Sequence, residues 1–328
     1  MTTEPSATAF PTTPERGFVR LARANLAAQT AEQIALAAAP IIAVVSLGAT
    51  ESDTGWLQTA QTLPFLLLSI PAGLLVDRLQ PRQVMAVTEA LRALAMAVLV
   101  VLLLSGKLSL LWLALLGFVA ASATVAFTVA APALVPALVL TQRLGWANGR
   151  LELARTIAYA LGPALAGIMI ARLGAAPAFV VTAVLSASAA LLLMRLASVP
   201  RTVQPAPKPL QQIAEGARFV IGHDLLRPIF ITQFVFGVAI FMLQAVYVPY
   251  AIRHLQMSTE RVGFTLAAYG AGMIVGASLA ARVVALLPRR IASIHWVIDA
   301  GDECRVIGAQ KRDHIGNVLS VAQPADRM

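Results

Sequence analysis

One apolar segment of the chain, residues 24–48, carries polar side chains on a single face. Drawn as an α-helix with about 100° per residue, it places four of them within about 100° of one another: Asn25, Gln29, Glu32 and Gln33. Ionisable side chains in such segments are costly to bury and usually face a water-filled cavity or a partner. Since a carboxyl group whose surroundings change can bind and release a proton, Glu32 is a candidate proton-binding residue.

Two other apolar segments also carry polar side chains on one face. They are Gln233, Gln244 and Tyr247 in residues 228–250, and Thr124 and Thr128 in residues 110–134. Such groups either line a wet path or form hydrogen bonds between packed helices, which contribute about 0.6 kcal/mol each. A threonine can also bond to the backbone of its own helix. The sequence leaves these alternatives open.

Glu89 and Arg92 lie three residues apart in the apolar segment 84–105. On a helix this spacing brings the two side chains together, so they are predicted to form an ion pair with a structural role.

Nothing in the sequence indicates an enzyme, a cofactor or a metal site. The four histidines and the single cysteine do not have the spacing of metal ligands, and no phosphate-binding Gly-rich loop with Lys-Ser/Thr occurs. We find no nucleophile with a nearby base. The sequence therefore predicts no enzyme, no cofactor and no bound metal.

The elements that must position these residues are membrane-spanning helices. Hydrophobic residues make up 58% of the 328 residues and charged residues only 12%, which is about half the usual share for a soluble protein. Because about 20 apolar residues cross a bilayer as a helix, eight segments are predicted to span it. They are residues 24–48, 55–76, 84–105, 110–134, 151–171, 176–198, 228–250 and 262–286. Continuous apolar runs exclude a β-barrel, whose strands alternate.

Basic residues indicate the orientation. Sixteen Lys and Arg lie at one set of segment ends, and four lie at the other set: Lys107, Arg172, Arg253 and Arg261. Since positive charge collects in cytoplasmic loops, both termini are predicted to be cytoplasmic, in the plasma or inner membrane. A net charge of +9 can also indicate nucleic-acid binding, but here the charge is spread over alternate loops, so the partner is the lipid bilayer.

The predicted spans form two groups. Residues 1–15 are predicted to be a disordered tail, and residues 16–198 a bundle of six helices. Residues 199–227 form a cytoplasmic linker in which Leu210, Ile213, Ala217 and Ile221 recur at helical spacing, as in an amphipathic helix at the membrane surface. Residues 228–288 supply two more spans, and residues 289–328 are a hydrophilic tail.

The turn after the second span resembles a signature of the major facilitator superfamily. Gly73, Asp77, Arg78 and Arg82 match positions of its Gly-x-x-x-Asp-Arg-x-x-Arg-Arg motif between spans 2 and 3. Leu161-Gly162-Pro163-Ala164-Leu165-Ala166-Gly167 is similar to the Gly-Pro-x-x-x-Gly element of exporters in that superfamily. Physically, Pro163 removes one helix hydrogen bond, and Gly162 and Gly167 let a neighbouring helix pack closely.

The resemblance covers residues 17–288 and is greatest to the branch of siderophore exporters and macrolide efflux proteins. It implies an all-α fold with a six-helix half and an incomplete second half, because the family has twelve helices. It also implies that the polar faces of spans 1, 4 and 7 line the substrate path, and that the turn between spans 2 and 3 controls the inner gate.

The function implied is export of a small organic molecule by alternating access, with protons as the coupling ion and Glu32 as the coupling residue. The alternative is a truncated or frameshifted remnant that does not transport. A third hypothesis, an enzyme acting on lipid, would need convergent acid, base or metal ligands, which the sequence does not offer.

Overall fold

The computed structural model describes residues 16–196 and 209–286, and for residues 77, 209–215, 277–278 and 280–286 it describes the backbone only. The predicted tails at 1–15 and 289–328 and the first part of the linker lie outside these residues. The chain forms two compact units, residues 1–271 and 272–328. Among the described residues, the first unit contains eight α-helices and the start of a ninth, and the second contains the rest of that ninth helix, through Leu286.

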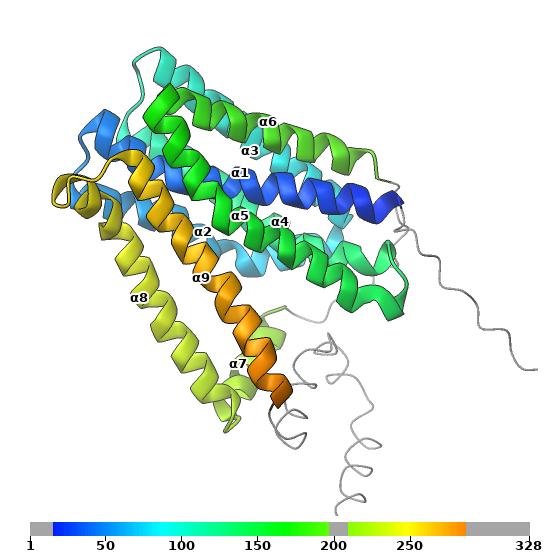
Figure 1. Ribbon diagram of the computed structural model, residues 1–328. Helices are drawn as coiled ribbons and strands as arrows, with labels where there is room; N and C mark the ends of the chain where they lie inside the picture. The colour runs from blue at the N-terminus through cyan, green and yellow to red at the C-terminus, as the bar shows by residue number, and fades with distance from the viewer. Residues whose placement is uncertain (1–15, 197–208, 287–328) are drawn as a thin grey trace, which may run out of the picture. The chain divides into compact units, whose positions relative to one another are not determined.

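Nine α-helices and two short 3-10 turns make up the described part of the chain (Figure 1). The helices are α1 (Arg16–Leu47), α2 (Glu51–Arg78), α3 (Pro81–Leu104), α4 (Leu110–Leu134), α5 (Leu144–Leu173), α6 (Ala175–Met194), α7 (Pro209–Gly222), α8 (Leu226–Arg253) and α9 (Thr259–Leu286). Helix α7 forms at the position predicted for the amphipathic helix of the linker.

Local sequence explains where several helices begin and end. Thr50 caps α2 through a reciprocal pair of bonds: its hydroxyl accepts from the Asp53 N–H at 3.2 Å, and the Asp53 carboxylate accepts from the Thr50 N–H at 2.8 Å. Pro81 opens α3 at a position that needs no N–H donor. Gly174, with φ of +85°, ends α5 and lets the chain turn into α6.

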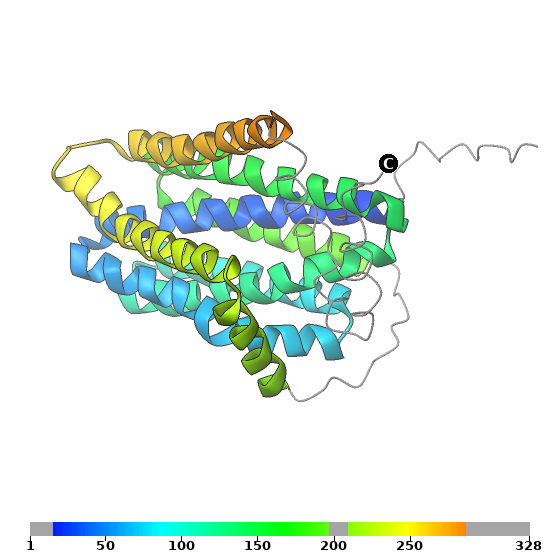
Figure 2. The same cartoon turned by 90° about the horizontal axis from the view of Figure 1, so that it is seen from below.

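Helix α1 is the central helix of the six-helix bundle. It packs along α5 and α6 and also contacts α2, α4 and α8 (Figures 1 and 2). Its buried face is rich in alanine, including Ala24, Ala28, Ala31, Ala38 and Ala43. Small side chains let helices approach closely, and this is how helices associate without a hydrophobic driving force in lipid.

Helix α8 is far more exposed than the helices of the bundle. Large apolar side chains such as Phe230, Phe234 and Phe241 are about half exposed, and the buried residues of α8 lie at its C-terminal end. Figure 2 shows this end, with the connection to α9, at the same end of the bundle as the α1–α2 loop. An apolar surface of this kind requires lipid or further helices around it.

The helices agree with the predicted spans. Seven described helices are long and apolar enough to cross a membrane, namely α1–α6 and α8. The apolar segments of α4 and α5 also include the short 3-10 turns that lie between these two helices. The predicted eighth span coincides with α9. Two helices begin well before the predicted spans, α1 at Arg16 rather than residue 24 and α5 at Leu144 rather than residue 151, whereas the other starts differ by at most four residues. Both extensions are less apolar turns that continue a helix beyond the hydrocarbon thickness.

Candidate functional site

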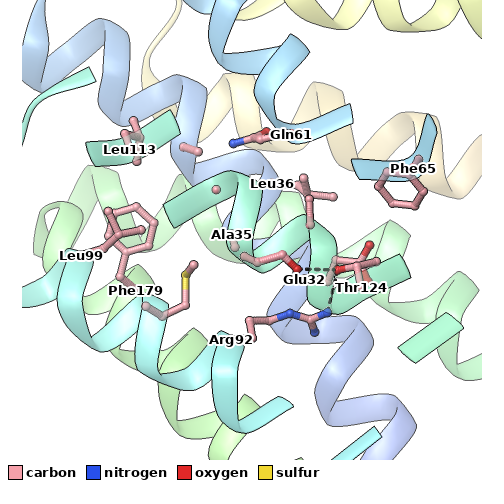
Figure 3. A pocket seen from close by; sticks show the side chains of 15 residues that line it. Glu32, Ala35, Leu36, Gln61, Phe65, Arg92, Leu99, Leu113, Thr124 and Phe179 are labelled. Carbon is pink, nitrogen blue, oxygen red and sulfur yellow. Dashed lines mark hydrogen bonds between the residues drawn. The ribbon is translucent and has the colours of Figure 1, made fainter. Parts of the chain in front are cut away.

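A small cavity lies within the six-helix bundle. Its walls come from α1, α2, α3, α4 and α6, and its volume is about 40 Å³. Figure 3 shows Glu32, Arg92 and Thr124 together at one end, whereas Leu99, Leu113 and Phe179 lie at the other. This volume suits a few water molecules but is far below the roughly 300–1,000 Å³ of sites for drug-sized molecules. In this conformation the cavity is therefore large enough for water, through which protons can move, but too small for a drug-sized molecule.

A buried ion pair forms the polar wall of this cavity. The Arg92 guanidinium lies 2.8 Å from the Glu89 carboxylate, and the two residues are only 1% and 0% exposed. Arg92 also donates to the Thr124 hydroxyl at 2.6 Å and to the Ala28 carbonyl at 3.2 Å. The predicted pair is confirmed, but the sequence did not indicate that Arg92 also lines the cavity beside Glu32 and connects α3 with α1 and α4.

Of the predicted substrate-path residues, the structure brings Glu32 and Thr124 together at this cavity. Asn25, Gln29 and Gln33 are buried in the bundle. Thr128, Gln233 and Gln244 are exposed, while Tyr247 is partly buried and shares a hydrogen bond with Thr265 of α9. A role for these residues in the substrate path remains a prediction.

Asn25 forms a hydrogen bond between packed helices, which is one of the two roles that the sequence left open for the polar residues. Its side-chain amide donates to the Leu151 carbonyl of α5 at 3.2 Å.

We predict that Asn25→Ala lowers the stability of the protein by about 0.6 kcal/mol, because interhelical hydrogen bonds in membrane proteins average this value. Thermal unfolding in detergent measures the change. Asn148→Ala, at an exposed asparagine on α5, should leave the midpoint unchanged; equal midpoints for the two variants would contradict the assignment.

The predicted inner-gate motif lies where α2 turns into α3. Arg82 donates a hydrogen bond to the Leu196 carbonyl just after α6, and Arg20 of α1 donates to the neighbouring Arg195 carbonyl at 3.0 Å. Both guanidinium groups therefore hold carbonyls at the end of α6, where the helix dipole is negative. Gly73 has open space around it rather than a close neighbour, and Arg78 is exposed. A gating role for this motif remains a prediction.

The predicted helix-5 motif packs against two helices. A Cβ atom on Gly162 would collide with the Gln33 Cβ of α1, and one on Gly167 would lie 2.8 Å from the Gly263 Cα of α9. Further along, a Cβ on Gly270 would lie 2.6 Å from the Tyr159 carbonyl. The close packing expected of this motif is therefore present. Sequence analysis missed Gly263, which packs against Gly167, and Gly270, which packs against Tyr159 just before the motif.

Arg253, at the end of α8, joins this helix to the six-helix bundle. Its guanidinium donates to the Gly48 carbonyl at 2.9 Å and to the Ala49 carbonyl, and it lies 3.5 Å from the Glu51 carboxylate. A second ion pair at this end joins Arg172 of α5 to Glu260 of α9 at 3.6 Å. Together with the packing of Gly167 against Gly263, called here the glycine crossing, these contacts hold α8 and the start of α9 against the bundle. They lie at the end of the bundle that the charge pattern predicts to face outward.

We predict that Arg253→Gln loosens this closed end. The variant loses charge-assisted hydrogen bonds to two backbone carbonyls, each of which contributes about 1.5–3 kcal/mol. The readout is labelling of Ala49→Cys, at a residue only 1% exposed, with a membrane-impermeant maleimide in a Cys304→Ser background. Labelling should rise several-fold with Arg253→Gln. It should not change with Arg261→Gln, an exposed arginine on α9; unchanged labelling in both would refute the closing role of Arg253.

A wider groove lies between α2 and α8, with a volume of about 450 Å³. Its polar wall is a row on α2 that includes Ser52, Gln58, Thr59 and Thr62, and its apolar wall includes Trp56, Phe241 and Met242. A space of this size suits a small organic molecule. None of the predicted substrate-path residues lines it.

The fold and site define a multi-pass helical membrane protein with an ion pair buried inside its first helical bundle. The sequence profile described as the Major Facilitator Superfamily matches residues 21–296. The chain therefore belongs to this superfamily of membrane transporters, as the motifs predicted.

Comparisons with individual proteins agree with this assignment. The chain is 29% identical to the multidrug efflux pump Tap of Mycobacterium tuberculosis over 297 residues, which cover 87% of this chain and 70% of that pump. It is 30% identical to the Tap pump of Mycolicibacterium fortuitum over 266 residues, 78% of this chain and 64% of that pump. Its fold matches a crystal structure of a bacterial homologue of the lysosomal transporter Spinster, with a TM-score of 0.62 and 17% identity. That match covers 84% of this chain, which spans 65% of the length of the solved structure.

Proposed function

We propose that this chain exports small, drug-like organic molecules across the cytoplasmic membrane as a secondary active transporter, with protons as the coupling ion. The observation that carries the proposal is the carboxylate of Glu32 at a water-sized cavity beside a buried arginine, in a chain similar to multidrug efflux pumps. An ionisable group placed this way inside a membrane protein typically serves an ion or substrate pathway.

The mechanism proposed is alternating access. The contacts of Arg253, Arg172 and the α5–α9 glycines would hold the outward end closed, while substrate enters from the cytoplasm. Release outward would require these contacts to separate, as α8 and α9 move against the six-helix bundle. Glu32 would bind a proton in one state and lose it in the other. Both termini would lie in the cytoplasm.

Accumulation of ethidium, a fluorescent amphipathic organic cation, in a bacterial host without its main efflux pumps tests this function. Cells that express the chain should accumulate less dye than cells with an empty vector. A protonophore, which collapses the proton gradient, should abolish the difference. Equal accumulation with and without the chain would reject export of this class of substrate, and a difference that survives the protonophore would reject proton coupling.

A further inference from the structure

The fully or partly buried groups around Arg92 contain more negative than positive charge. Glu32 and Glu89 supply two carboxyl groups, and Arg92 supplies one guanidinium. Arg155 of α5 also acts on Glu32, but its own partner is Glu152 at 3.5 Å, and both side chains are about half exposed or more. With both carboxyl groups ionised, the cluster holds one uncompensated negative charge inside an apolar bundle, which is a costly arrangement.

Some atoms of this cluster lack the hydrogen bonds that buried polar atoms normally have. Within the described residues, the Arg92 Nε and the Glu89 Oε2 lack a hydrogen bond of good geometry, and the Glu89 Oε1 has the Arg92 guanidinium at 2.8 Å. Ser186 lies on α6 and faces the Glu89 carboxylate. A proton on a carboxyl group would supply a missing donor, and water in the adjoining cavity would supply further partners.

The Arg92 guanidinium is placed to pair with the carboxyl group of either Glu89 or Glu32. Its guanidinium pairs with Glu89, while a bond to Thr124 directs it to the end of the cavity where Glu32 lies (Figure 3). The five donors of a guanidinium can bind two acceptors at once, and its positive charge is permanent. The other groups that face the cluster are Tyr159 and Arg155 of α5, next to Glu32; α4 and α6 contribute the uncharged Thr124 and Ser186.

We propose that Glu32, Glu89 and Arg92 form one proton-binding site, in which two carboxyl groups share a single guanidinium and therefore hold one proton between them. This inference rests on the proposed function, and it extends the site from Glu32 alone to the ion pair of α3. Glu89 then determines whether Glu32 carries a proton, because it competes with Glu32 for Arg92.

Charge counting gives opposite expectations for two variants. In Glu89→Gln one carboxyl group remains with one guanidinium, so Glu32 keeps Arg92 to itself and stays ionised. In the double variant Glu89→Gln/Arg92→Gln, Glu32 remains with no guanidinium in the cluster and takes up a proton. Replacing both partners of a buried pair is usually tolerated better than replacing one, so the double variant also covers the case in which the single variant does not fold.

The test uses dicyclohexylcarbodiimide, which reacts with protonated carboxyl groups in apolar surroundings, on the purified chain in detergent at neutral pH. Mass spectrometry of the peptide that contains Glu32 measures its labelling. Labelling should fall several-fold in Glu89→Gln and rise several-fold above the unmodified chain in the double variant. Asp224→Asn, at an exposed aspartate before α8, should leave it unchanged.

Equal Glu32 labelling in the unmodified chain and both variants would overturn the shared site, and so would a fall in Glu89→Gln that removing Arg92 does not reverse. If Glu89→Gln does not yield a monodisperse protein, the double variant decides alone: labelling above the unmodified chain supports the site, and equal labelling overturns it. The readout needs no transport. A chain that shows the labelling pattern but no dye export would retain the shared site and refute the proposed function.

Discussion

Replacing Glu32 by Gln is expected to abolish proton-driven transport while preserving passive exchange of substrate. Gln has nearly the same shape as Glu but cannot release a proton, so the proposed cycle loses the step that couples it to the gradient. In proteoliposomes, ethidium flux driven by a pH gradient should fall to the level of empty vesicles. Exchange of ethidium between two equal concentrations should continue, because that process needs substrate binding and not proton release.

The control for this variant is Glu152→Gln. It makes the same chemical change at a carboxylate that is 64% exposed on α5. Its gradient-driven flux should match that of the unmodified chain. Gradient-driven flux that persists in Glu32→Gln would remove Glu32 from the coupling step, and loss of exchange as well as driven flux would show a structural or substrate-binding role instead.

The second large effect is expected from Gly167→Leu. A Cβ atom at this position would lie 2.7 Å from the Thr259 carbonyl oxygen and 2.8 Å from the Gly263 Cα, both of which are backbone atoms that cannot move aside by changing a rotamer. The helices α5 and α9 must therefore separate. Overpacking of this kind typically costs about 1–3 kcal/mol, and here the contact also belongs to the closed end of the bundle.

Accessibility of α9 measures the separation. Val262→Cys, at a fully buried residue, should gain several-fold in maleimide labelling when Gly167→Leu is present, in a Cys304→Ser background. Gly149→Leu is the matched control, because Gly149 lies on the same helix with nothing within 4 Å of its Cβ position. Should the two leucine variants give the same labelling, the glycine crossing would not be what holds α9 to α5.

Sequence reasoning predicted the helices because lipid leaves the backbone few alternatives. An apolar run of about 20 residues in a bilayer must form a helix, and its composition is visible locally. The Glu89–Arg92 pair was predictable for the same reason, since residues three apart on a helix are neighbours. The start of α5 at Leu144 was missed because helices continue into less apolar turns, which carry no hydropathy signal.

The arrangement of the site could not be predicted to the same extent. The position of Arg92 beside Glu32 depends on how α3 packs against α1 and α4, and no spacing within α3 reports on that. The same holds for Arg253, whose partners lie more than 200 residues away in the sequence. Asn25 shows the opposite case: it lies on the predicted polar face of α1, but the position of α5 gives it a carbonyl partner.

Of the glycines where α5 and α9 pack together, only those on α5 could be predicted from the sequence. The motif at Gly162 and Gly167 indicated close packing, but Gly263 and Gly270, the glycines of α9 that pack against α5, belong to no motif. A signal was present in their spacing of seven residues, which places them on one face of a helix. That spacing becomes informative only when the partner helix is known.

The most direct measurement is the flux of ethidium into or out of proteoliposomes that contain only the purified chain, recorded together with internal pH. Proton-coupled export predicts dye movement against its own gradient when a pH gradient is imposed, accompanied by proton movement in the opposite direction. Dye and proton movements equal to those of protein-free vesicles, at every imposed gradient, would contradict it.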